Sequence, residues 1–361
     1  MLLEENKPLA SFTTFSIGGP ARWYVRAESE DEIAEAVAWA ADRKVALFVL
    51  GGGSNLLVSD AGFNGLVLHI GLLGITVAED AGHTIYEAAA GEDWDSFVQR
   101  TVEEQCAGIE CLAGIPGTVG GTPVQNVGAY GEEVASSIAR VRAFDITGRD
   151  FVEFAATACG FAYRRSRFNS VDRGRYIVTR VDYRLTPGGA PTLRYADLQR
   201  AFPAGSTATL AEVAAEVRRI RQGKGMLLVE GDPDCRSAGS FFKNPIVSAE
   251  RVAEIAAIAG KDPPRFPAGS GAEEAGSLKI PAAWLIEQAG FAKGYRLGAA
   301  GISSRHTLAL VNRGQDGRGA TAAEILALAG TIAGTVEERF GIALEREPVL
   351  LGFTAHDTRE P

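Results

Sequence analysis

Three short stretches of the chain carry side chains that could do chemistry: YRRSRF (163–168), GSFFKNP (239–245) and LEREPV (344–349). Ser240, in the second stretch, lies between a glycine and two phenylalanines. A nucleophilic serine needs a histidine base and a GxSxG turn, and neither is indicated here. On local pattern alone, Ser240 is a serine hydrogen-bonded in a turn, and the charged groups of the other two stretches are solvated.

The stretch GGGSNLLVSD (51–60) has the composition of an anion-binding loop. It follows a strand predicted at 45–50, and three successive glycines let neighbouring N–H groups point into one concavity that suits a pyrophosphate. Ser54 and Asn55 can add side-chain donors. The residues that follow are strand-like, whereas a GxGxxG dinucleotide loop would start a helix there. The stretch therefore predicts either an anion loop of another design or a tight turn.

A second glycine-rich stretch, AGIPGTVGGTPVQNVGAYG (113–131), is largely apolar. So many glycines allow the backbone to lie against a flat ligand, and an irregular core loop would not need this density. Gln125 and Asn126 can hydrogen-bond to the edges of a ring. Two such loops in one chain favour a large nucleotide cofactor that has both a ring system and a pyrophosphate.

The bulk composition narrows the class of protein. A chain of 361 residues is expected to form two or three domains. The net charge of −9 argues against nonspecific nucleic-acid binding, so local cations must meet any anionic substrate. Four cysteines without CxxC spacing and four histidines indicate neither a metal site nor a disulfide framework. Because no leader and no apolar run of about 18 residues is evident, we expect a cytoplasmic protein without a membrane span.

Helices and strands are mixed along the chain without regular alternation, which predicts an α+β fold. Capping boxes open three helices, and a proline start and helical periodicity indicate two more. Alternating apolar runs indicate the strands, two of which form a hairpin around Thr147-Gly148. The predicted helices span 31–44, 210–224, 248–260, 281–289 and 322–340, and the predicted strands span 45–50, 65–70, 84–90, 141–146, 151–154, 176–185, 307–312 and 349–353.

Beyond these local patterns, seven motifs are spread along nearly the whole chain and resemble, in order, those of the UDP-N-acetylenolpyruvoylglucosamine reductases. GSFFKNP and GIPGTVGG are the most specific of them. The motifs are TTFSIGGPARW (13–23), VLGGGSNLLVSD (49–60), GIPGTVGGTPVQNVGAYG (114–131), YRRSRF (163–168), AGSFFKNP (238–245), PAAWLIEQAGFAKGYRLGAAGISSRHTLALVN (281–312) and FGIALEREP (340–348).

The resemblance implies an FAD-binding fold of the vanillyl-alcohol-oxidase (PCMH) type, made of two subdomains, with a C-terminal α+β domain that binds substrate. It also implies a monomeric flavoenzyme with non-covalent FAD. NADPH reduces the flavin, which then reduces UDP-N-acetylglucosamine enolpyruvate to UDP-N-acetylmuramate for peptidoglycan. The predicted divisions are FAD subdomains at 1–70 and 71–225, a substrate domain at 226–340, a strand returning to the FAD domain at 341–353 and a polar tail at 354–361.

By the same resemblance, Arg164 polarises the carboxylate of the substrate, Ser240 donates the proton and Glu347 helps to stabilise the intermediate. Two departures from the family pattern bear on these roles. Arg165 replaces the acid of the usual YRDS, and LEREPV replaces LEPEVR, so that Glu345 is the alternative to Glu347.

The resemblance also implies the binding residues. Arg221 and Lys224 close the helix at 210–224 and could meet the substrate diphosphate, although cations at a helix end are also favoured by its dipole. Lys243 could serve either NADPH or the substrate phosphates. The predicted substrate contacts are Tyr163, Tyr195 (in the tyrosine-bearing insertion of one subtype), Lys224, Asn244 and Gln288. The predicted FAD contacts are Gly51, Gly52, Gly53, Ser54, Asn55, Leu56, Gly114, Ile115, Pro116, Gly117, Thr118, Gly120, Gly121, Gln125, Asn126, Gly128 and Ala129.

Two other functions would share parts of this pattern. A flavin oxidase would keep the glycine loops but not GSFFKNP or the terminal EREP, and a covalent flavin link would have His69 as its nearest candidate. A nucleotide-binding scaffold would keep the fold without the combination of Arg164, Ser240 and Glu347.

Overall fold

The computed structural model describes residues 1–268 and 276–354, so the predicted tail lies outside the described residues except for its first residue. The chain divides into two compact units, and each is described by itself. Unit 1 comprises residues 1–7, 21–52 and 64–222, and unit 2 comprises residues 8–20, 53–63 and 223–361. Within the described part of the chain, no helix combines the length and apolar character that crossing a bilayer requires.

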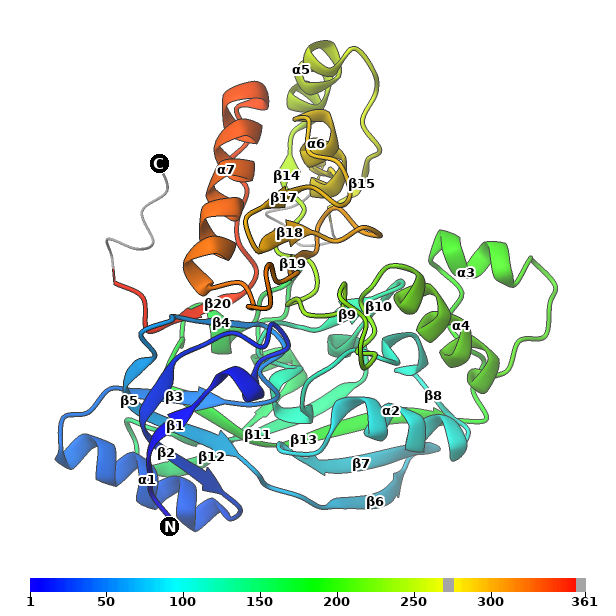
Figure 1. Ribbon diagram of the computed structural model, residues 1–361. Coiled ribbons are helices and arrows are strands. Elements are labelled where there is room, and N and C mark those ends of the chain that lie inside the picture. The colour runs from blue at the N-terminus through cyan, green and yellow to red at the C-terminus, as the bar shows by residue number, and fades with distance from the viewer. Residues whose placement is uncertain (269–275, 355–361) are drawn as a thin grey trace. The chain divides into compact units, whose positions relative to one another are not determined.

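The larger sheet of unit 1 has the strand order β12-β11-β13-β7-β6, and all of these neighbours are antiparallel (Figure 1). The hairpin expected at 141–154 is confirmed, because β11 and β12 pair up to Asp145 and Asp150 on either side of the predicted turn. The short β8 pairs with the end of β13. The strands are β6 (Ile75–Asp80), β7 (His83–Ala89), β8 (Cys106–Ala107), β11 (Ile138–Asp145), β12 (Asp150–Ala155) and β13 (Tyr176–Pro187).

A second sheet, in the order β1-β2-β5-β3, leads to the first glycine loop. Strand β3 is parallel to β5 and ends at Leu50, directly before that loop. Helix α1 connects β2 to β3. Its Ser29 cap accepts the N–H of Glu32 (3.2 Å), whereas the Glu32 carboxylate accepts from Glu28 (2.7 Å), so the predicted capping box is half formed. The elements are β1 (Glu4–Pro8), β2 (Pro20–Ala27), α1 (Glu30–Asp42), β3 (Leu47–Leu50) and β5 (Phe63–Ile70).

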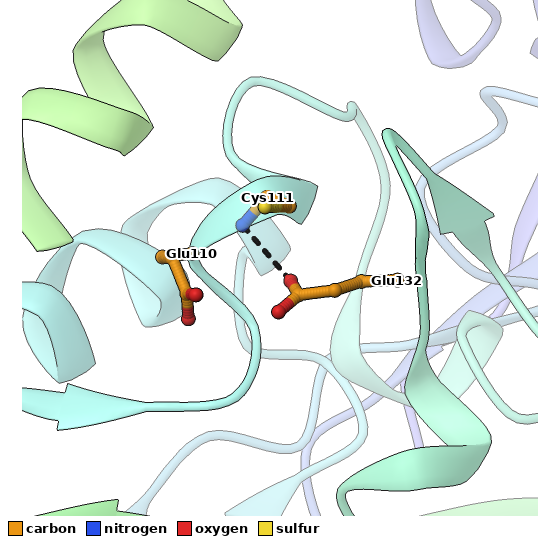
Figure 2. A group of neighbouring side chains, drawn as sticks. All are labelled: Glu110, Cys111 and Glu132. Atoms are coloured by element: carbon orange, nitrogen blue, oxygen red, sulfur yellow. Dashed lines mark hydrogen bonds between the residues drawn. The ribbon is translucent and has the colours of Figure 1, made fainter. Parts of the chain in front are cut away.

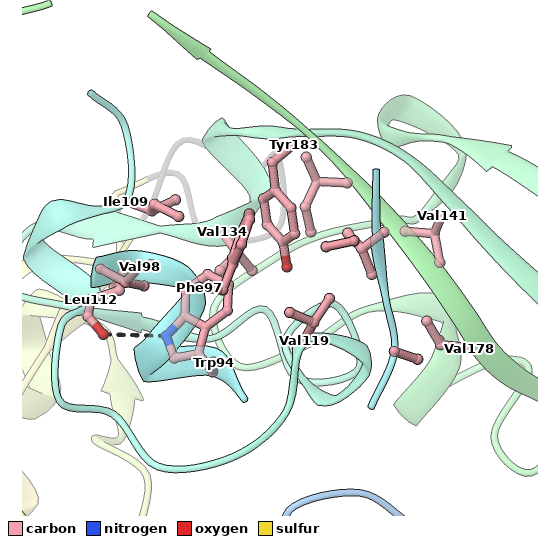
Figure 3. Packing of buried hydrophobic residues seen from close by; sticks show 14 of the residues in the cluster. Trp94, Phe97, Val98, Ile109, Leu112, Val119, Val134, Val141, Val178 and Tyr183 are labelled. Carbon is pink, nitrogen blue, oxygen red and sulfur yellow. Dashed lines mark hydrogen bonds between the residues drawn. The ribbon is translucent and has the colours of Figure 1, made fainter. Parts of the chain in front are cut away.

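Helix α2 (Trp94–Glu103) supplies the aromatic centre of the unit 1 core, and the sequence analysis missed it. The rings of Trp94, Phe97 and Tyr183 pack against one another with centroids 5.1–5.9 Å apart (Figure 3). The sequence does carry the signs of this helix. Trp94, Phe97 and Val98 have helical spacing, and Asp93 is a capping residue that accepts the N–H of Ser96 (2.8 Å) in the first turn. The buried indole also donates to the carbonyl of Leu112 (3.2 Å), which fixes the start of the second glycine loop.

Unit 2 has its own core, which includes the two phenylalanines of GSFFKNP and the buried face of helix α7. The predicted capping box at Thr321 is confirmed, and α7 ends at Gly341, whose φ is +59°. The Asp60 carboxylate adds hydrogen bonds to the N–H groups of Ala322 (2.8 Å) and Ala323 (3.1 Å) at the start of α7. Strand β20 pairs in parallel with β4, so the last strand lies beside the end of the first glycine loop.

The elements of unit 2 are β4 (Leu56–Val58), β14 (Ile246–Val247), α5 (Ala249–Ala259), β15 (Phe266–Pro267), β16 (Leu278–Lys279), α6 (Ala282–Gln288), β17 (Arg296–Leu297), β18 (Ala300–Ile302), β19 (Leu310–Asn312), α7 (Ala322–Phe340) and β20 (Val349–Leu351). Unit 1 further contains β9 (Gly128–Ala129), β10 (Glu132–Glu133), α3 (Ala196–Ala201) and α4 (Leu210–Gly223). The 3-10 turns are η1 (Ala10–Phe12), η2 (Glu110–Leu112), η3 (Val119–Gly121), η4 (Val134–Ser136), η5 (Ala156–Ala158) and η6 (Arg167–Asn169).

Candidate cofactor and active site

The first glycine loop leaves β3 and lies with its backbone directly against the second loop. A Cβ on Gly52 would lie 2.5 Å from the Cα of Gly117, and a Cβ on Gly51 would lie 2.9 Å from the Oγ1 of Thr118. Neither place admits a side chain. The N–H groups of residues 51–54 donate to no acceptor among the residues that the structure describes. The loop therefore presents several donors without internal partners, as an anion-binding nest requires.

In unit 2 the same loop is fixed by other neighbours. Gly53 has a φ of +63°, and a Cβ there would lie 1.7 Å from the carbonyl oxygen of Phe12. The Asn55 side chain donates to the carbonyl of Glu347 (3.2 Å), and the carbonyl of Asn55 accepts from Val349 (3.0 Å). The loop predicted to bind the cofactor is thus hydrogen-bonded to the segment that carries the predicted catalytic glutamate.

The second loop is clamped at Gly114, whose φ is +73°. Its N–H donates to Asp95 Oδ1 (2.5 Å), and its carbonyl accepts from Arg221 Nε (2.9 Å). Arg221 is buried, and burial lowers its pKa. Further along the loop, a Cβ on Gly120 would lie 2.5 Å from the Cβ of Ala90. Asp95 was missed with the rest of α2, and Arg221, considered above for the substrate diphosphate, supports the loop backbone.

Asn126 connects the second loop to the turn that carries Arg164. Its buried amide donates to Glu133 Oε2 (2.9 Å) and to the carbonyl of Ala162 (3.0 Å), and it accepts from the N–H of Ala135 (3.1 Å). Both N–H groups of the amide are therefore used within the protein. The cofactor contact at Asn126 stays a prediction, and the observed role of its side chain is to position two segments of the site.

Arg164 occupies the corner of a tight turn. Ala162 and Arg165 exchange two backbone hydrogen bonds (2.9 and 3.0 Å), and Arg164 between them has a φ of +53°, which is uncommon for a residue other than glycine. Asn169 donates to the carbonyl of Arg164 (3.1 Å). The Arg164 guanidinium lies 5.6 Å from the centre of the Tyr163 ring, whereas Arg165 is exposed. The turn thus separates the environment of Arg164 from that of the arginine that follows it.

Ser240 is not the hydrogen-bonded turn serine that its local pattern favours. Its hydroxyl makes no hydrogen bond with any residue in the described part of the chain. Gly239 has a φ of +71° and open space around a would-be Cβ, so glycine is required there by backbone conformation. Phe241 and Phe242 are fully buried with their rings 5.3 Å apart. The core therefore holds the backbone while the hydroxyl stays available.

A histidine that the sequence analysis overlooked supports this segment. The N–H of Phe241 donates to the carbonyl of Leu308 (2.8 Å), and the N–H of Leu308 donates to His306 Nδ1 (3.1 Å). Burial, with the cations Lys224 and Lys293 nearby, lowers the pKa of His306 to about 4. The imidazole is therefore neutral at pH 7, and its remaining proton lies on Nε2. The sequence feature that could have identified this histidine is the motif at 281–312, in which His306 immediately precedes a predicted strand.

The two candidate glutamates have different surroundings. The N–H of Glu347 donates to the carbonyl of Phe241 (2.9 Å), so this residue is held beside the GSFFKNP segment. Glu345 is exposed, and its carboxylate forms an ion pair with Lys243. These contacts favour Glu347 over Glu345 as the acid placed near Ser240. The ion pair with Glu345 also gives the Lys243 side chain a partner within the protein, so no ligand is needed to explain this lysine.

The remaining predicted substrate residues of unit 2 lie around helix α6 and at the end of α4. Asn244 Oδ1 accepts the N–H of Ala282 (2.9 Å) and so caps α6, while Gln288 ends that helix. Lys224 directly follows α4. The structure thus collects the predicted groups in two sets: Tyr163, Arg164 and Tyr195 in unit 1, and Lys224, Ser240, Asn244, Gln288 and Glu347 in unit 2.

Two family models match the chain. One is described as an FAD binding domain and matches residues 21–150, and the other is described as the C-terminal domain of UDP-N-acetylenolpyruvoylglucosamine reductase and matches residues 232–351. The reductase of Streptomyces coelicolor is 46% identical over 96% of this chain and 89% of its own length. That of Thermobifida fusca is 44% identical over 97% of this chain and 98% of its own. This chain belongs to the UDP-N-acetylenolpyruvoylglucosamine reductase family.

The solved structure of the reductase from Thermus caldophilus is 26% identical, covers 97% of this chain and all of its own, and superposes with a TM-score of 0.64. The predicted fold class is confirmed. The protein has an α+β fold with an FAD-binding domain, followed by the C-terminal domain of the reductase family. It is an FAD-dependent oxidoreductase.

The residues present fit FAD. Gly51 and Gly52 lie so close to the second loop that neither has room for a Cβ atom. The N–H groups of residues 51–54, which have no acceptor among the described residues, can donate to a pyrophosphate. The backbone around Gly117 is rich in glycine, so a flat ring can lie directly against it. His69 shares a hydrogen bond with the Tyr24 hydroxyl (2.7 Å), and burial lowers its pKa to about 4, so its surroundings are those of a structural histidine.

Replacing Gly52 with alanine is expected to lower the amount of bound FAD strongly. Its Cβ would lie 2.5 Å from Gly117 Cα, closer than real Cβ contacts, so one loop must move away from the other. The visible flavin absorbance per protein after purification measures the effect. Gly334→Ala is the control, because no atom lies within 4 Å of its would-be Cβ. Full flavin content in Gly52→Ala would contradict the assignment of this loop to the cofactor.

Proposed function

We propose that the protein catalyses the NADPH-dependent reduction of UDP-N-acetylglucosamine enolpyruvate to UDP-N-acetylmuramate, a step of peptidoglycan precursor synthesis. The observation that carries this proposal is the match to the reductases over 96% of the chain, with both glycine loops and GSFFKNP intact. When bound, FAD supplies the redox chemistry by accepting a hydride from NADPH and passing it to the substrate. The remaining chemistry belongs to the side chains of this protein.

The substrate makes three demands on those side chains. Hydride addition to the methylene carbon of an enol ether leaves negative charge on the neighbouring carbon, which also carries a carboxylate. A cation must hold the carboxylate, a polar group must stabilise the enolate, and an acid must protonate it on the correct face.

Arg164 is the proposed cation. A guanidinium stays charged at all relevant pH values and can form two parallel hydrogen bonds with a carboxylate. The tight turn at 162–165 supports this role because it fixes the backbone from which the side chain starts, and Asn126 anchors that turn through the carbonyl of Ala162. Tyr163 is the proposed neighbour of the bound substrate on the same turn.

Ser240 is the proposed proton donor, and Glu347 the proposed group that helps to stabilise the enolate. A serine hydroxyl is a weak acid, so it must act by position and lose its proton only as the enolate forms. Two observations support this role: its hydroxyl has no hydrogen bond to the residues that the structure describes, and the phenylalanines beside it are buried. The hydrogen bond between Glu347 and Phe241 supports the choice of Glu347.

The substrate-binding residues and the cellular setting belong to the same proposal. Lys224 would meet the diphosphate, Tyr195 would cover the substrate, and Asn244 and Gln288 would contact it from the segments around α6. We assign the enzyme to the cytoplasm as a monomer, and its four free cysteines suit a reducing compartment. The proposed division has FAD subdomains at 1–70 and 71–225, a substrate domain at 226–340 and a returning strand at 341–353, which the pairing of β20 with β4 supports.

The function is tested by steady-state assay of the purified yellow protein. NADPH consumption is expected to require UDP-N-acetylglucosamine enolpyruvate and to yield one UDP-N-acetylmuramate per NADPH. An oxidase would instead consume oxygen with its own alcohol or sugar substrate and would ignore the enolpyruvyl nucleotide. Oxygen consumption without nucleotide reduction would overturn the proposal.

A further inference from the structure

Outside the proposed active site, unit 1 contains a buried cluster of Glu110, Cys111 and Glu132 (Figure 2). Glu110 lies on η2 and Glu132 on β10, at the end of the second glycine loop. One oxygen of Glu110 accepts the N–H of Gly108 (2.8 Å), and one oxygen of Glu132 accepts the N–H of Cys111 (3.0 Å). The ligand-type atoms of the three residues lie within 4.8 Å of one another, so the two carboxyl groups are close neighbours without bulk water between them.

The cluster also holds a segment that is distant in sequence. The N–H of Thr192 donates to Glu110 Oε1 (2.8 Å), and the Cys111 thiol donates to the carbonyl of Thr192 (3.1 Å). The Thr192 side chain also acts on the Glu132 carboxyl and lowers its pKa. Residues 191–194 have no regular secondary structure of their own, so these contacts are their main polar anchor in the described structure. We call Glu110, Cys111, Glu132 and Thr192 the clasp.

The clasp sets the position of Tyr195, three residues further along. Gly131, next to Glu132, has a φ of +88°, and its would-be Cβ lies 3.1 Å from Arg194 Cβ and 3.4 Å from Tyr195 N. The ring of Tyr195 packs edge-on against that of Tyr130, with centroids 5.3 Å apart, and Tyr195 is the N-cap residue directly before α3. Any side chain larger than hydrogen at Gly131 would move this segment. The position of Tyr195 therefore depends on contacts with β10 and its turn.

The two carboxyl groups of the clasp, Glu110 and Glu132, must hold one proton between them. Two carboxylates this close in a buried place cannot both be ionised without strong repulsion. Burial and the charge of Glu110 raise the pKa of Glu132 to about 8, against the opposing hydrogen bonds from Thr192 and Cys111. The Cys111 thiol faces both carboxyl groups, and its pKa is raised by burial and by their charge, so it remains neutral. The largest influences on the Glu132 pKa are its burial and the neighbouring Glu110.

We infer that Glu110 and Glu132, sharing a proton and binding Thr192, are positioning residues that hold Tyr195 ready to cover the substrate. The inference rests on the proposed role of Tyr195. Loss of the shared proton places two charges side by side, weakens the hold on Thr192 and frees the segment before α3. Substrate binding then weakens, while the groups that perform the chemistry are untouched.

The test compares the wild type with Glu132→Gln at about pH 6 and about pH 9, because glutamine keeps the shape of the protonated acid without its titration. In the wild type, the KM for the enolpyruvyl substrate is expected to rise about fivefold at the higher pH, the effect of one lost hydrogen bond, with a smaller change in kcat. The hydrogen-exchange protection factor of the peptide containing Thr192 is expected to fall over the same range. In Glu132→Gln both quantities are expected to stay flat.

Unfolding by urea gives an independent readout of the same proton. The folded protein holds it up to about pH 8, whereas the unfolded chain releases it in the ordinary glutamate range. The wild type is therefore expected to lose stability between these pH values, and Glu132→Gln is expected to lose less. Glu103→Gln, an exposed glutamate on α2, is the control that should follow the wild type.

Two results would overturn the inference: an equal rise of KM with pH in the wild type and in Glu132→Gln, or wild-type protection at Thr192 that does not change with pH. A separate measurement tests the proposed role of Tyr195 itself. If Tyr195→Ala leaves KM unchanged, Tyr195 does not cover the substrate, and the protection factor alone then decides whether the clasp exists.

Discussion

Ser240→Ala is expected to slow reduction of the enolpyruvyl substrate by a factor of about 10² to 10⁴, the range for loss of a positioned general acid. Reduction of the flavin by NADPH should stay nearly unchanged, because that half-reaction needs no proton from this hydroxyl. The two half-reactions are measured separately by single-turnover absorbance. The fold supports a local effect, since Gly239 and the buried rings of Phe241 and Phe242 hold the backbone whatever side chain follows Gly239.

Ser240→Cys is the matched variant, because a thiol is a proton donor of similar size and greater acidity. It should retain more of the second half-reaction than Ser240→Ala does. Equal losses in both half-reactions, or equal rates for the alanine and cysteine variants, would remove Ser240 from the role of proton donor and return it to a structural one.

Arg164→Gln is expected to lower kcat by a factor of about 10² to 10³, as for loss of one group that stabilises charge in a transition state. It should also raise KM, because in the proposed mechanism the same guanidinium binds the substrate carboxylate. Arg164→Lys should recover only part of both effects, since an ammonium keeps the charge and loses the two-pronged geometry. Steady-state kinetics on protein with full flavin content measure these changes.

Arg165→Ala is the control for that series. Arg165 is adjacent in sequence and exposed, and it lies outside the left-handed corner of the turn. It should behave like the wild type. A loss in Arg165→Ala as large as that in Arg164→Gln would show that the basic stretch acts through its overall charge, which is the solvated-patch interpretation of YRRSRF.

Capping residues and alternating apolar patterns in the sequence predicted helix starts and a hairpin, because these features depend on residues that are close together in the chain. The pairs Thr209/Glu212 and Thr321/Glu324 form reciprocal caps because both partners lie within one helical turn. The hairpin of β11 and β12 depends on alternation and on one short turn. Helix α2 carried comparable signals in its Asp93 cap and in the spacing of Trp94, Phe97 and Val98, and it was overlooked.

The rest of the candidate site depends on contacts between residues far apart in the chain. Nothing near Asn126 indicates that its amide binds the carbonyl of Ala162, and nothing near Glu110 indicates that it shares a site with Glu132. The availability of the Ser240 hydroxyl is likewise a property of the folded chain, because its own neighbours favour a hydrogen-bonded turn. Motif resemblance supplied the candidate residues, and the structure shows the contacts that position them.

The central claim is that this protein passes reducing equivalents from NADPH to an enolpyruvyl nucleotide in two separate steps. Anaerobic stopped-flow mixing of the NADPH-reduced enzyme with UDP-N-acetylglucosamine enolpyruvate tests it most directly. We predict rapid return of the oxidised-flavin absorbance in the wild type, with one UDP-N-acetylmuramate formed per enzyme, and slow return in Ser240→Ala. A reduced wild-type enzyme that ignores the nucleotide and regains its absorbance only when oxygen is admitted would contradict the account.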